Sequence, residues 1–310
     1  MAKPGYDYLV GGVTITNDIT YADGSMTKQQ LGGGLFALEG VRLWTDNVLY
    51  ITNVGPDYEQ YYGAWMRANG MSTEGANCCL QHTHYTDLYY RPDGTFTEVS
   101  KYSGVTFTGN GDYAVQAWQI EAVAEGVKGL YLDEHVRAGL WEELLTIRDR
   151  YGFKLMWEIP TRDLEDPQYY DEVRQLIKKV DLYSLNKPES FHFFGVDNEQ
   201  DAIRKIMELG VPCFYRVGKK GSYMVADGQA AFAPSVDIGE PVDPTGCGNC
   251  STASALYCWC EGCDPLMTAI MSNIAAAHNI LQHGPYPQFT KQTEANARKL
   301  AEELYQKYKK

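Results

Sequence analysis

The chain has 310 residues, a formal net charge of −13 at pH 7 and 44% hydrophobic residues. This composition excludes a disordered or low-complexity protein, and the acidic balance argues against nucleic acid or an anionic membrane surface as the main partner. No apolar run approaches the roughly 20 residues that cross a bilayer, and Met1–Gly5 leads into a strand-like segment without a signal peptide. We therefore expect a cytoplasmic protein built as a single domain over residues 1–310.

The first third of the chain is predicted to contain strands, helices and glycine-rich loops. Tyr6–Ile15 is typical of a buried strand, followed by a polar loop at Thr16–Asp18. Leu31–Gly34 is expected to be a loop that precedes a helix at Leu35–Glu39. The further elements expected here are a buried strand at 48–54 and a helix at 58–69.

A hairpin is predicted next. Thr86–Tyr90 and Thr95–Val99 are short strand-like runs joined by Arg91–Gly94, which reads Arg-Pro-Asp-Gly. Aromatic and polar residues alternate along both runs, which indicates a partly exposed sheet apart from the main core.

From Asp112 onward, strand and helix patterns alternate, which predicts a parallel sheet covered on both faces. The expected strands are 129–132, 153–158, 181–185, 213–217 and 222–226, and the expected helices include 139–151, 166–180 and 198–209. Ligands of such sheets bind beyond the carboxyl ends of the strands. The polar candidates at that edge are Asn17 and Asp18, Asp133–His135, Glu158, Asn186–Glu189 and Arg216–Gly221.

The C-terminal third is predicted to be helical, at Cys247–Glu261, Pro265–His283 and Lys291–Lys309. Two Cys-x-x-Cys pairs occur here, at Cys247/Cys250 and Cys260/Cys263, and this spacing is also found in zinc sites. A continuous helix between them would separate the pairs by about 15–20 Å, which is too far for one zinc ion. We expect free thiols instead.

The run Asp243–Asn249, Asp-Pro-Thr-Gly-Cys-Gly-Asn, is predicted to be a turn that feeds the first of these helices. Two glycines around one residue allow backbone N–H groups to converge, and the helix N-terminus adds roughly half a positive charge. Such a site suits a phosphate or an oxyanion, although a glycine-rich helix start is also compatible with a simple tight turn. Cys247 has two interpretations, a small residue that fits the turn or a thiol activated by the helix N-terminus.

Several stretches together resemble, in order, the ribokinase-like (PfkB) carbohydrate kinase family. On the N-terminal side, Gly11-Gly12 with Asn17-Asp18 resembles the first strand and its substrate-binding acidic residue. Gly32-Gly33 is similar to the first glycine motif of the family, and Thr86–Val99 is similar to its β lid.

On the C-terminal side, Asn186-x-x-Glu189 resembles the Asn-x-x-Glu motif that helps to place Mg²⁺ and phosphate. Val217–Gly221 is similar to the Gly-x-x-Gly turn on the nucleotide side, and Asp243–Asn249 to the Asp-Thr-x-Gly-Ala-Gly-Asp motif. The resemblance implies a three-layer α/β/α sandwich with a mainly parallel central sheet, and a small lid formed from about 14–30 and 84–108.

The family transfers a phosphoryl group from ATP to a hydroxyl of a sugar, a nucleoside or a related polyol. The resemblance therefore implies ATP and Mg²⁺ as cofactors, leaves a monovalent cation open, and implies a small-molecule substrate, with a homodimer through the lid as an option. The implied site residues are catalytic Gly246, Cys247, Gly248 and Asn249; substrate-binding Asn17, Asp18, Gly32 and Gly33; and cofactor-binding Asn186, Glu189, Gly218, Lys219 and Gly221, with Glu189 holding Mg²⁺ through water.

Asn249 departs from the family pattern, because the motif ends in an aspartate that accepts the proton of the substrate hydroxyl. An amide cannot act as that base, and loss of a general base typically costs about 10²–10⁴-fold in rate. Phosphoryl transfer has a loose transition state, so correct positioning of the acceptor hydroxyl alone leaves room for turnover. Candidate residues for another base are Asp18, Asp133 and Asp243. The family's sugar-binding Asn after Gly32-Gly33 falls near Ala37, which argues against a simple ribokinase or fructokinase.

Three hypotheses remain open from the sequence. The first is a small-molecule kinase with an impaired or relocated base. The second is a catalytically weak kinase-fold protein that binds a nucleotide or sugar and acts as a sensor or regulator. The third is a hydrolase-type enzyme that reuses the anion hole, with Cys247 or an aspartate reacting. We rank the kinase first because the phosphate-binding motifs are all retained.

Overall fold

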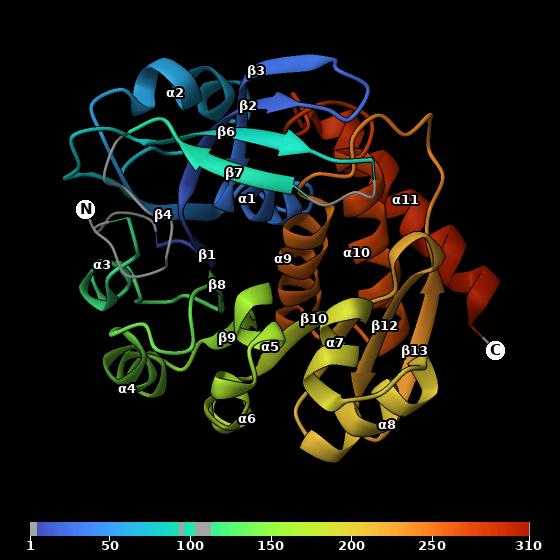
Figure 1. The fold of residues 1–310 in the computed structure, drawn as a ribbon. Coiled ribbons are helices and arrows are strands. Elements are labelled where there is room, and N and C mark those ends of the chain that lie inside the picture. Colours follow the sequence, from blue (N-terminus) through green and yellow to red (C-terminus); the bar gives the residue numbers. More distant parts are fainter. Residues whose placement is uncertain (1–4, 93–95, 103–112, 310) are drawn as a thin grey trace.

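The computed structural model describes residues 5–92, 96–102 and 113–309, which form two β-sheets flanked by helices (Figure 1). The larger sheet has nine strands in the order β13-β12-β11-β10-β9-β8-β1-β4-β5, and the smaller one has four in the order β3-β2-β6-β7. Within the described residues, no helix is both long and apolar enough to cross a membrane.

The larger sheet is mainly parallel, as predicted. From β5 to β11 every neighbouring pair is parallel, and at the other edge the pairings of β11 with β12 and of β12 with β13 are antiparallel. Its strands are β1 (Tyr8–Gly11), β4 (Val48–Val54), β5 (Ala76–Cys78), β8 (Gly129–Asp133), β9 (Lys154–Glu158), β10 (Leu182–Asn186), β11 (Cys213–Arg216), β12 (Gly221–Ala226) and β13 (Gln229–Pro234).

Helices cover both faces of this sheet, so its strands are buried on both sides. One face packs against α1 (Gly34–Arg42), α2 (Tyr58–Ala68), α9 (Cys247–Cys260), α10 (Pro265–Asn279) and α11 (Lys291–Tyr308). The other packs against α3 (Ala117–Glu121), α4 (Trp141–Tyr151), α5 (Thr161–Glu165), α6 (Tyr170–Ile177), α7 (Lys187–Phe194) and α8 (Glu199–Leu209). The three-layer α/β/α architecture is confirmed.

The smaller sheet consists of β2 (Thr14–Thr20), β3 (Met26–Gly33), β6 (His84–Tyr90) and β7 (Phe96–Ser100). It lies across the end of the molecule near the start of α9 (Figure 1). Pairing is antiparallel for β2 with β3 and for β6 with β7, and parallel for β2 with β6. The lid expected from about 14–30 and 84–108 includes residues 93–95 and 103–108, which lie outside the described residues.

The prediction of one strand over Tyr6–Ile15 with a loop at Thr16–Asp18 is wrong. The chain leaves the main sheet after Gly11, and β2 in the lid includes all three polar residues. The cause is a close approach to the start of α1: Gly34 N–H donates to the Val13 carbonyl over 2.9 Å, and a Cβ on Gly33 would collide with that same oxygen. Leu31–Gly33, expected to be a loop, ends strand β3.

The parallel strands place their carboxyl ends at one edge of the sheet, and α9 begins at that edge. As predicted, α9 is continuous from Cys247 to Cys260. The fold thereby brings Glu158, Asn186 and Arg216, which end β9, β10 and β11, toward the first turn of α9.

Candidate active site

The first turn of α9 is formed by the predicted glycine motif. Gly246 is the N-cap in a left-handed conformation with φ 85°, and a Cβ on it would collide with the Phe36 ring, so glycine is required there. Cys247 N–H donates to the Pro244 carbonyl over 3.2 Å. The N–H groups of Gly248 and Asn249 precede the first intrahelical donors and are available to an anion at the positive end of the helix.

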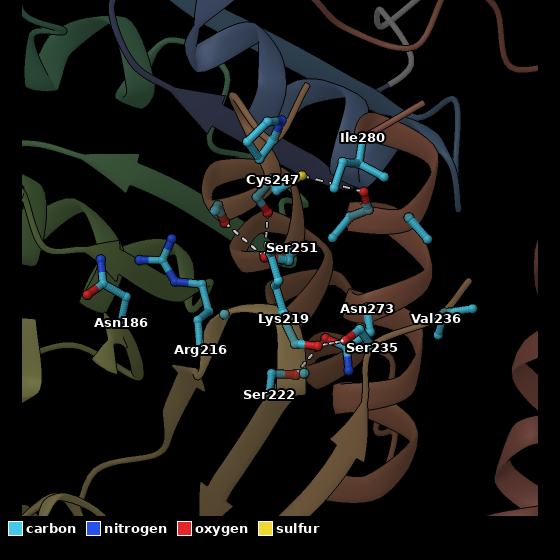
Figure 2. A pocket seen from close by; sticks show the side chains of 16 residues that line it. Asn186, Arg216, Lys219, Ser222, Ser235, Val236, Cys247, Ser251, Asn273 and Ile280 are labelled. Atoms are coloured by element: carbon cyan, nitrogen blue, oxygen red, sulfur yellow. Dashed lines mark hydrogen bonds between the residues drawn. The ribbon is translucent and has the colours of Figure 1, made fainter. Parts of the chain in front are cut away.

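A pocket of about 380 Å³ opens beside this turn (Figure 2). Residues from three predicted motifs line it together: Asn186 at the end of β10, Gly218, Lys219 and Gly221 between β11 and the start of β12, and Cys247 and Gly248 of α9. Its far wall includes Ser222, Ser235, Val236, Asn273, Ala276, Ala277 and Ile280. The pocket combines a largely apolar lining with a few polar groups, which is typical of a small-molecule site.

Asn186 and Glu189 form a capping box at the start of α7. Asn186 Oδ1 accepts from Glu189 N–H over 3.0 Å, and Glu189 Oε2 accepts from Asn186 N–H over 2.7 Å. Thr161 donates to Glu189 Oε1 over 2.8 Å. Burial raises the pKa of Glu189, although the nearby Arg216 acts in the opposite direction.

The residues at this corner fit Mg²⁺ only through its bound waters. Glu189 is 3% exposed and, unlike Asn186, does not line the pocket. No group of three or more metal-binding side chains occurs among the described residues. A carboxylate offers about four acceptor positions, so Glu189 has capacity left for a water of a hydrated Mg²⁺, which usually keeps several waters.

The Cys247 thiol is held in a packed environment. Asn279 Nδ2 donates to the sulfur over 3.2 Å, and the sulfur lies 3.6 Å from the Ala276 carbonyl. Burial raises the pKa of Cys247 to about 11, which outweighs the lowering expected from the helix N-terminus. The thiol is therefore mostly protonated near neutral pH, which favours the interpretation of Cys247 as a small packing residue.

Asn249 belongs to a buried polar network behind the turn. Its Nδ2 donates to the Tyr131 hydroxyl over 3.1 Å, and that hydroxyl donates to Glu158 Oε2 over 2.5 Å. Glu158 Oε1 in turn lies 3.1 Å from Arg216 Nη1. Tyr131 is fully buried, and burial with the neighbouring Glu158 charge raises its pKa well above the ordinary value. The hydroxyl therefore stays protonated. Asn249 Nδ2 faces this hydroxyl, and Oδ1 points away from it.

Asp133 and Asp243, two of the candidate substitute bases, have different surroundings. Burial, together with the charges of Glu158 and Glu134, raises the pKa of Asp133 well above its ordinary value. Asp243 is 2% exposed and accepts from Tyr21 over 2.8 Å. Its pKa is lowered, because the hydrogen bonds that it accepts outweigh burial. Asp243 is thus an ionised carboxylate tied to the lid.

The predicted substrate residues lie in the lid and at the start of α1. Asn17 Oδ1 accepts from Thr86 over 2.7 Å, and a Cβ on Gly32 would lie 2.9 Å from Asn17 Nδ2. Asp18 pairs with Lys101 Nζ at 2.6 Å and accepts from the Tyr85 hydroxyl over 2.7 Å. The structure thus brings Asn17 and Gly32 together and engages Asp18 within the lid.

Two tyrosines connect the lid to the loop before α9. Tyr21 contacts Asp243, as described above, and the Tyr90 hydroxyl lies 3.1 Å from Thr245 Oγ1. The two tyrosine rings stack with centroids 5.9 Å apart. The lid therefore contacts the loop that leads into the first turn of α9.

Residues 41–292 match the family model described as pfkB family carbohydrate kinase. The chain belongs to this family. No curated protein matches the sequence significantly.

Solved structures of related fold extend over nearly the whole chain. An adenosine kinase from Sinorhizobium meliloti shares 18% identity over 95% of this chain and 99% of its own, with a TM-score of 0.76. A ribokinase from Arabidopsis thaliana, complexed with ribose and ATP, shares 15% identity over 96% and 99% of the two chains, with a TM-score of 0.74. A ribokinase-like protein from E. coli in complex with ATP and Mg²⁺ shares 16% identity over 96% and 99%, also with a TM-score of 0.74.

Three residues of the candidate site have no role assigned from the sequence. Glu158 ends a predicted strand and Arg216 lies near the end of another, which places both at the expected ligand-binding edge, and Tyr131 falls within a predicted buried strand. Each has an unremarkable sequence context. Their convergence depends on the register among β8, β9, β10 and β11, for which the sequence alone has no signal.

Proposed function

We propose that this protein is a small-molecule kinase that transfers the γ-phosphoryl group of ATP to a hydroxyl of a sugar, a nucleoside or a related polyol. The observation that carries the proposal is the first turn of α9. There, Gly248 lines a pocket together with Asn186, Gly218 and Lys219, and the N–H group of the next residue, Asn249, belongs to the same turn. Preorganised donors of this kind stabilise the charge that develops on a transferring phosphoryl group.

ATP is the proposed donor, with Mg²⁺ as its metal. In this proposal the Gly218–Gly221 turn and Lys219 hold the nucleotide, and Glu189 with Asn186 orients Mg²⁺ through water. Mg²⁺ supplies charge neutralisation on the phosphates when it is bound. Support comes from the two solved relatives in complex with ATP, one of which also contains Mg²⁺.

The acceptor is proposed to bind between the lid and the carboxyl ends of the strands. Asn17, Gly32 and Gly33 would contact it, and Asp18 would act through the lid. Relatives of similar fold include an adenosine kinase and a ribokinase complexed with ribose, which supports the nucleoside and sugar classes. The exposed side chains of Tyr89 and Val99 suggest that the lid also pairs with a second copy.

In the proposed step, the acceptor oxygen forms a bond to the γ-phosphorus while the bond to the β–γ bridging oxygen breaks and ADP leaves. Asn249 Oδ1 accepts a hydrogen bond from the acceptor hydroxyl, because Nδ2 is committed to Tyr131. Because the transition state is loose, the hydroxyl proton leaves the acceptor oxygen late; it passes to the transferred phosphoryl group and departs with the phosphorylated product. Asn249 thus orients the nucleophile without taking its proton, and we expect slow turnover.

A second candidate function is a nucleotide-binding protein that transfers little, and Asn249 is the observation that favours it. Nothing comparable favours a hydrolase, because Cys247 is a protonated, packed thiol. Titration calorimetry with Mg·ATP, combined with turnover assays on a panel of sugars and nucleosides, distinguishes these functions. Binding with turnover supports the kinase, binding without turnover supports the second candidate, and no binding at millimolar ATP contradicts both.

A further inference from the structure

Arg216 occupies a place in the site that the motifs do not explain. It ends β11 in register with Asn186, so both residues lie at the edge where α9 begins. Figure 2 shows both side chains at the same end of the pocket. The guanidinium lies between two carboxylates, with Nη1 3.1 Å from Glu158 Oε1 and Nη2 3.8 Å from Glu189 Oε2.

The N–H donors of this guanidinium are poorly used within the described part of the chain. Arg216 Nε is buried without a hydrogen-bond partner. The contact to Glu189 is too long for a hydrogen bond, and the nearest approach to Glu158 joins Nη1 and Oε1 over 3.1 Å. A guanidinium has five donors in a fork that matches phosphate and carboxylate oxygens. An anion with several oxygens would satisfy donors that the two glutamates leave unpaired.

The guanidinium also packs against the anion-binding turn itself. A Cβ on Gly248 would collide with Arg216 Nη1 and would lie 3.8 Å from Glu158 Oε1. A fixed cation beside a helix N-terminus is unfavourable on its own, because both are positive. An anion placed between them converts this repulsion into two attractions, and the Gly248 and Asn249 N–H groups provide further donors at the same point.

We propose that Arg216 binds the terminal phosphoryl group of a nucleoside triphosphate, and that Glu158 and Glu189 hold its guanidinium in position beside the α9 turn. This inference rests on the proposed function, since it assigns a further phosphate-binding residue to the same site. Arg216 differs from the motif residues, Lys219 included, because it combines a full positive charge with a two-pronged donor. Glu158 keeps the guanidinium beside the turn, but its negative charge also offsets part of the positive charge that a phosphate would meet.

Binding of tripolyphosphate in EDTA, followed by titration calorimetry at fixed salt, tests this role without metal or turnover. We expect Arg216→Gln to weaken binding by roughly ten- to a hundredfold, as for a lost charge-assisted contact. Arg216→Lys should recover part of the loss, because it keeps the charge and lacks the fork. Arg137→Gln is the matched control, since Arg137 also pairs with a glutamate, Glu172, but lies outside the pocket.

Glu158→Gln provides a variant that does not depend on whether Arg216→Gln folds well. Because glutamine removes the charge that offsets Arg216, Glu158→Gln should bind tripolyphosphate more tightly than the wild type. The gain should largely disappear when Arg216→Gln is added, because the two changes are then coupled. A purely structural ion pair would instead make Glu158→Gln no tighter, and its effect would be the same with or without Arg216.

Wild-type affinity in a folded Arg216→Gln protein, or an uncoupled Glu158→Gln effect, would overturn the inference. These outcomes are distinguishable from a failure of the proposed function. If tripolyphosphate binding depends on Arg216 and no acceptor is phosphorylated, the phosphate-binding role stands and the kinase function fails. If acceptors are phosphorylated normally by Arg216→Gln, the kinase function stands and the inference fails.

Discussion

The side-chain amide of Asn249 donates a hydrogen bond to the hydroxyl of Tyr131, which itself donates to Glu158. Asn249, at the position of the family's base, therefore supplies the donor that the Tyr131 hydroxyl oxygen can accept. The single proton of Tyr131 is committed to Glu158, so an amide donor at position 249 completes the network. An aspartate there would place a second carboxylate against the same hydroxyl, and like charges at short range raise a carboxyl pKa.

Tyr131→Phe should destabilise the protein. The change leaves the Asn249 amide and the Glu158 carboxylate each without one partner in a buried environment, and an unsatisfied buried group costs about 1–3 kcal/mol. Urea unfolding measures the loss. Tyr58→Phe is a suitable control, because the Tyr58 hydroxyl is also buried but has no hydrogen-bond partner among the described residues. Equal effects of the two changes would contradict the network.

Gly248→Ala should weaken nucleotide binding while leaving the fold intact. The new methyl group meets the far end of the flexible Arg216 side chain rather than backbone, so the guanidinium moves away from the turn. We expect at least about a tenfold loss of ATP affinity, equal to about 1.4 kcal/mol, by calorimetry. Gly139→Ala is the control, because a Cβ there has open space. Unchanged affinity in Gly248→Ala would show that the turn does not contact the phosphates.

The buried Glu39 should make stability depend on pH. Burial raises the pKa of Glu39 from the ordinary 4.5 to about 8, because the buried carboxyl is more stable when it is protonated. The stability that the protonated carboxyl contributes is fully present below about pH 4.5 and is lost as pH rises through 8. The unfolding free energy of the wild type should therefore fall, relative to Glu39→Gln, between about pH 5 and 8. The size is on the order of a few kcal/mol. The exposed Glu125→Gln is the control, and parallel pH curves for Glu39→Gln and wild type would refute the assignment.

The cysteines should differ sharply in reactivity. Iodoacetamide at pH 7.5, followed by peptide mass spectrometry, should label the exposed Cys78 and Cys79 well before Cys247. The thiolate is the reactive form, and the pKa of Cys247 is raised to about 11. Cys247→Ala should retain ATP binding, since alanine fits the same space. Rapid labelling of Cys247 that ATP prevents would revive the hypothesis of a reacting thiol.

Much of the fold was predictable from periodicity. The strand at Val48–Val54 and the three C-terminal helices are found within a few residues of their expected bounds. The helical segments are long, and the short apolar run is rich in β-branched residues, which favours a strand. The break after Gly11 was not predictable. Val13 and Ile15 continue the apolar pattern, and the change of direction is imposed by Gly33 and Gly34, about 20 residues away in the chain.

The candidate site divides in the same way. Backbone-driven parts, such as the Gly246–Gly248 turn and the Asn186–Glu189 capping box, have local sequence patterns and were recognised. The role of Arg216 has no local pattern, because it depends on which strands are neighbours and in what register. The departure at Asn249 was visible in the sequence, whereas its partner Tyr131 became apparent only once β8 was placed beside β9.

The kinase function is tested most directly by the transfer of label from [γ-³²P]ATP to a hydroxyl acceptor, compared between wild type and Asn249→Asp across pH. We expect slow transfer by the wild type and faster transfer by the variant, within the range of about 10²–10⁴ that a general base contributes. The gain should grow as pH rises, because the carboxyl opposite Glu158 ionises late. If Asn249→Asp binds ATP as tightly as the wild type and neither protein labels any acceptor, the kinase account is contradicted.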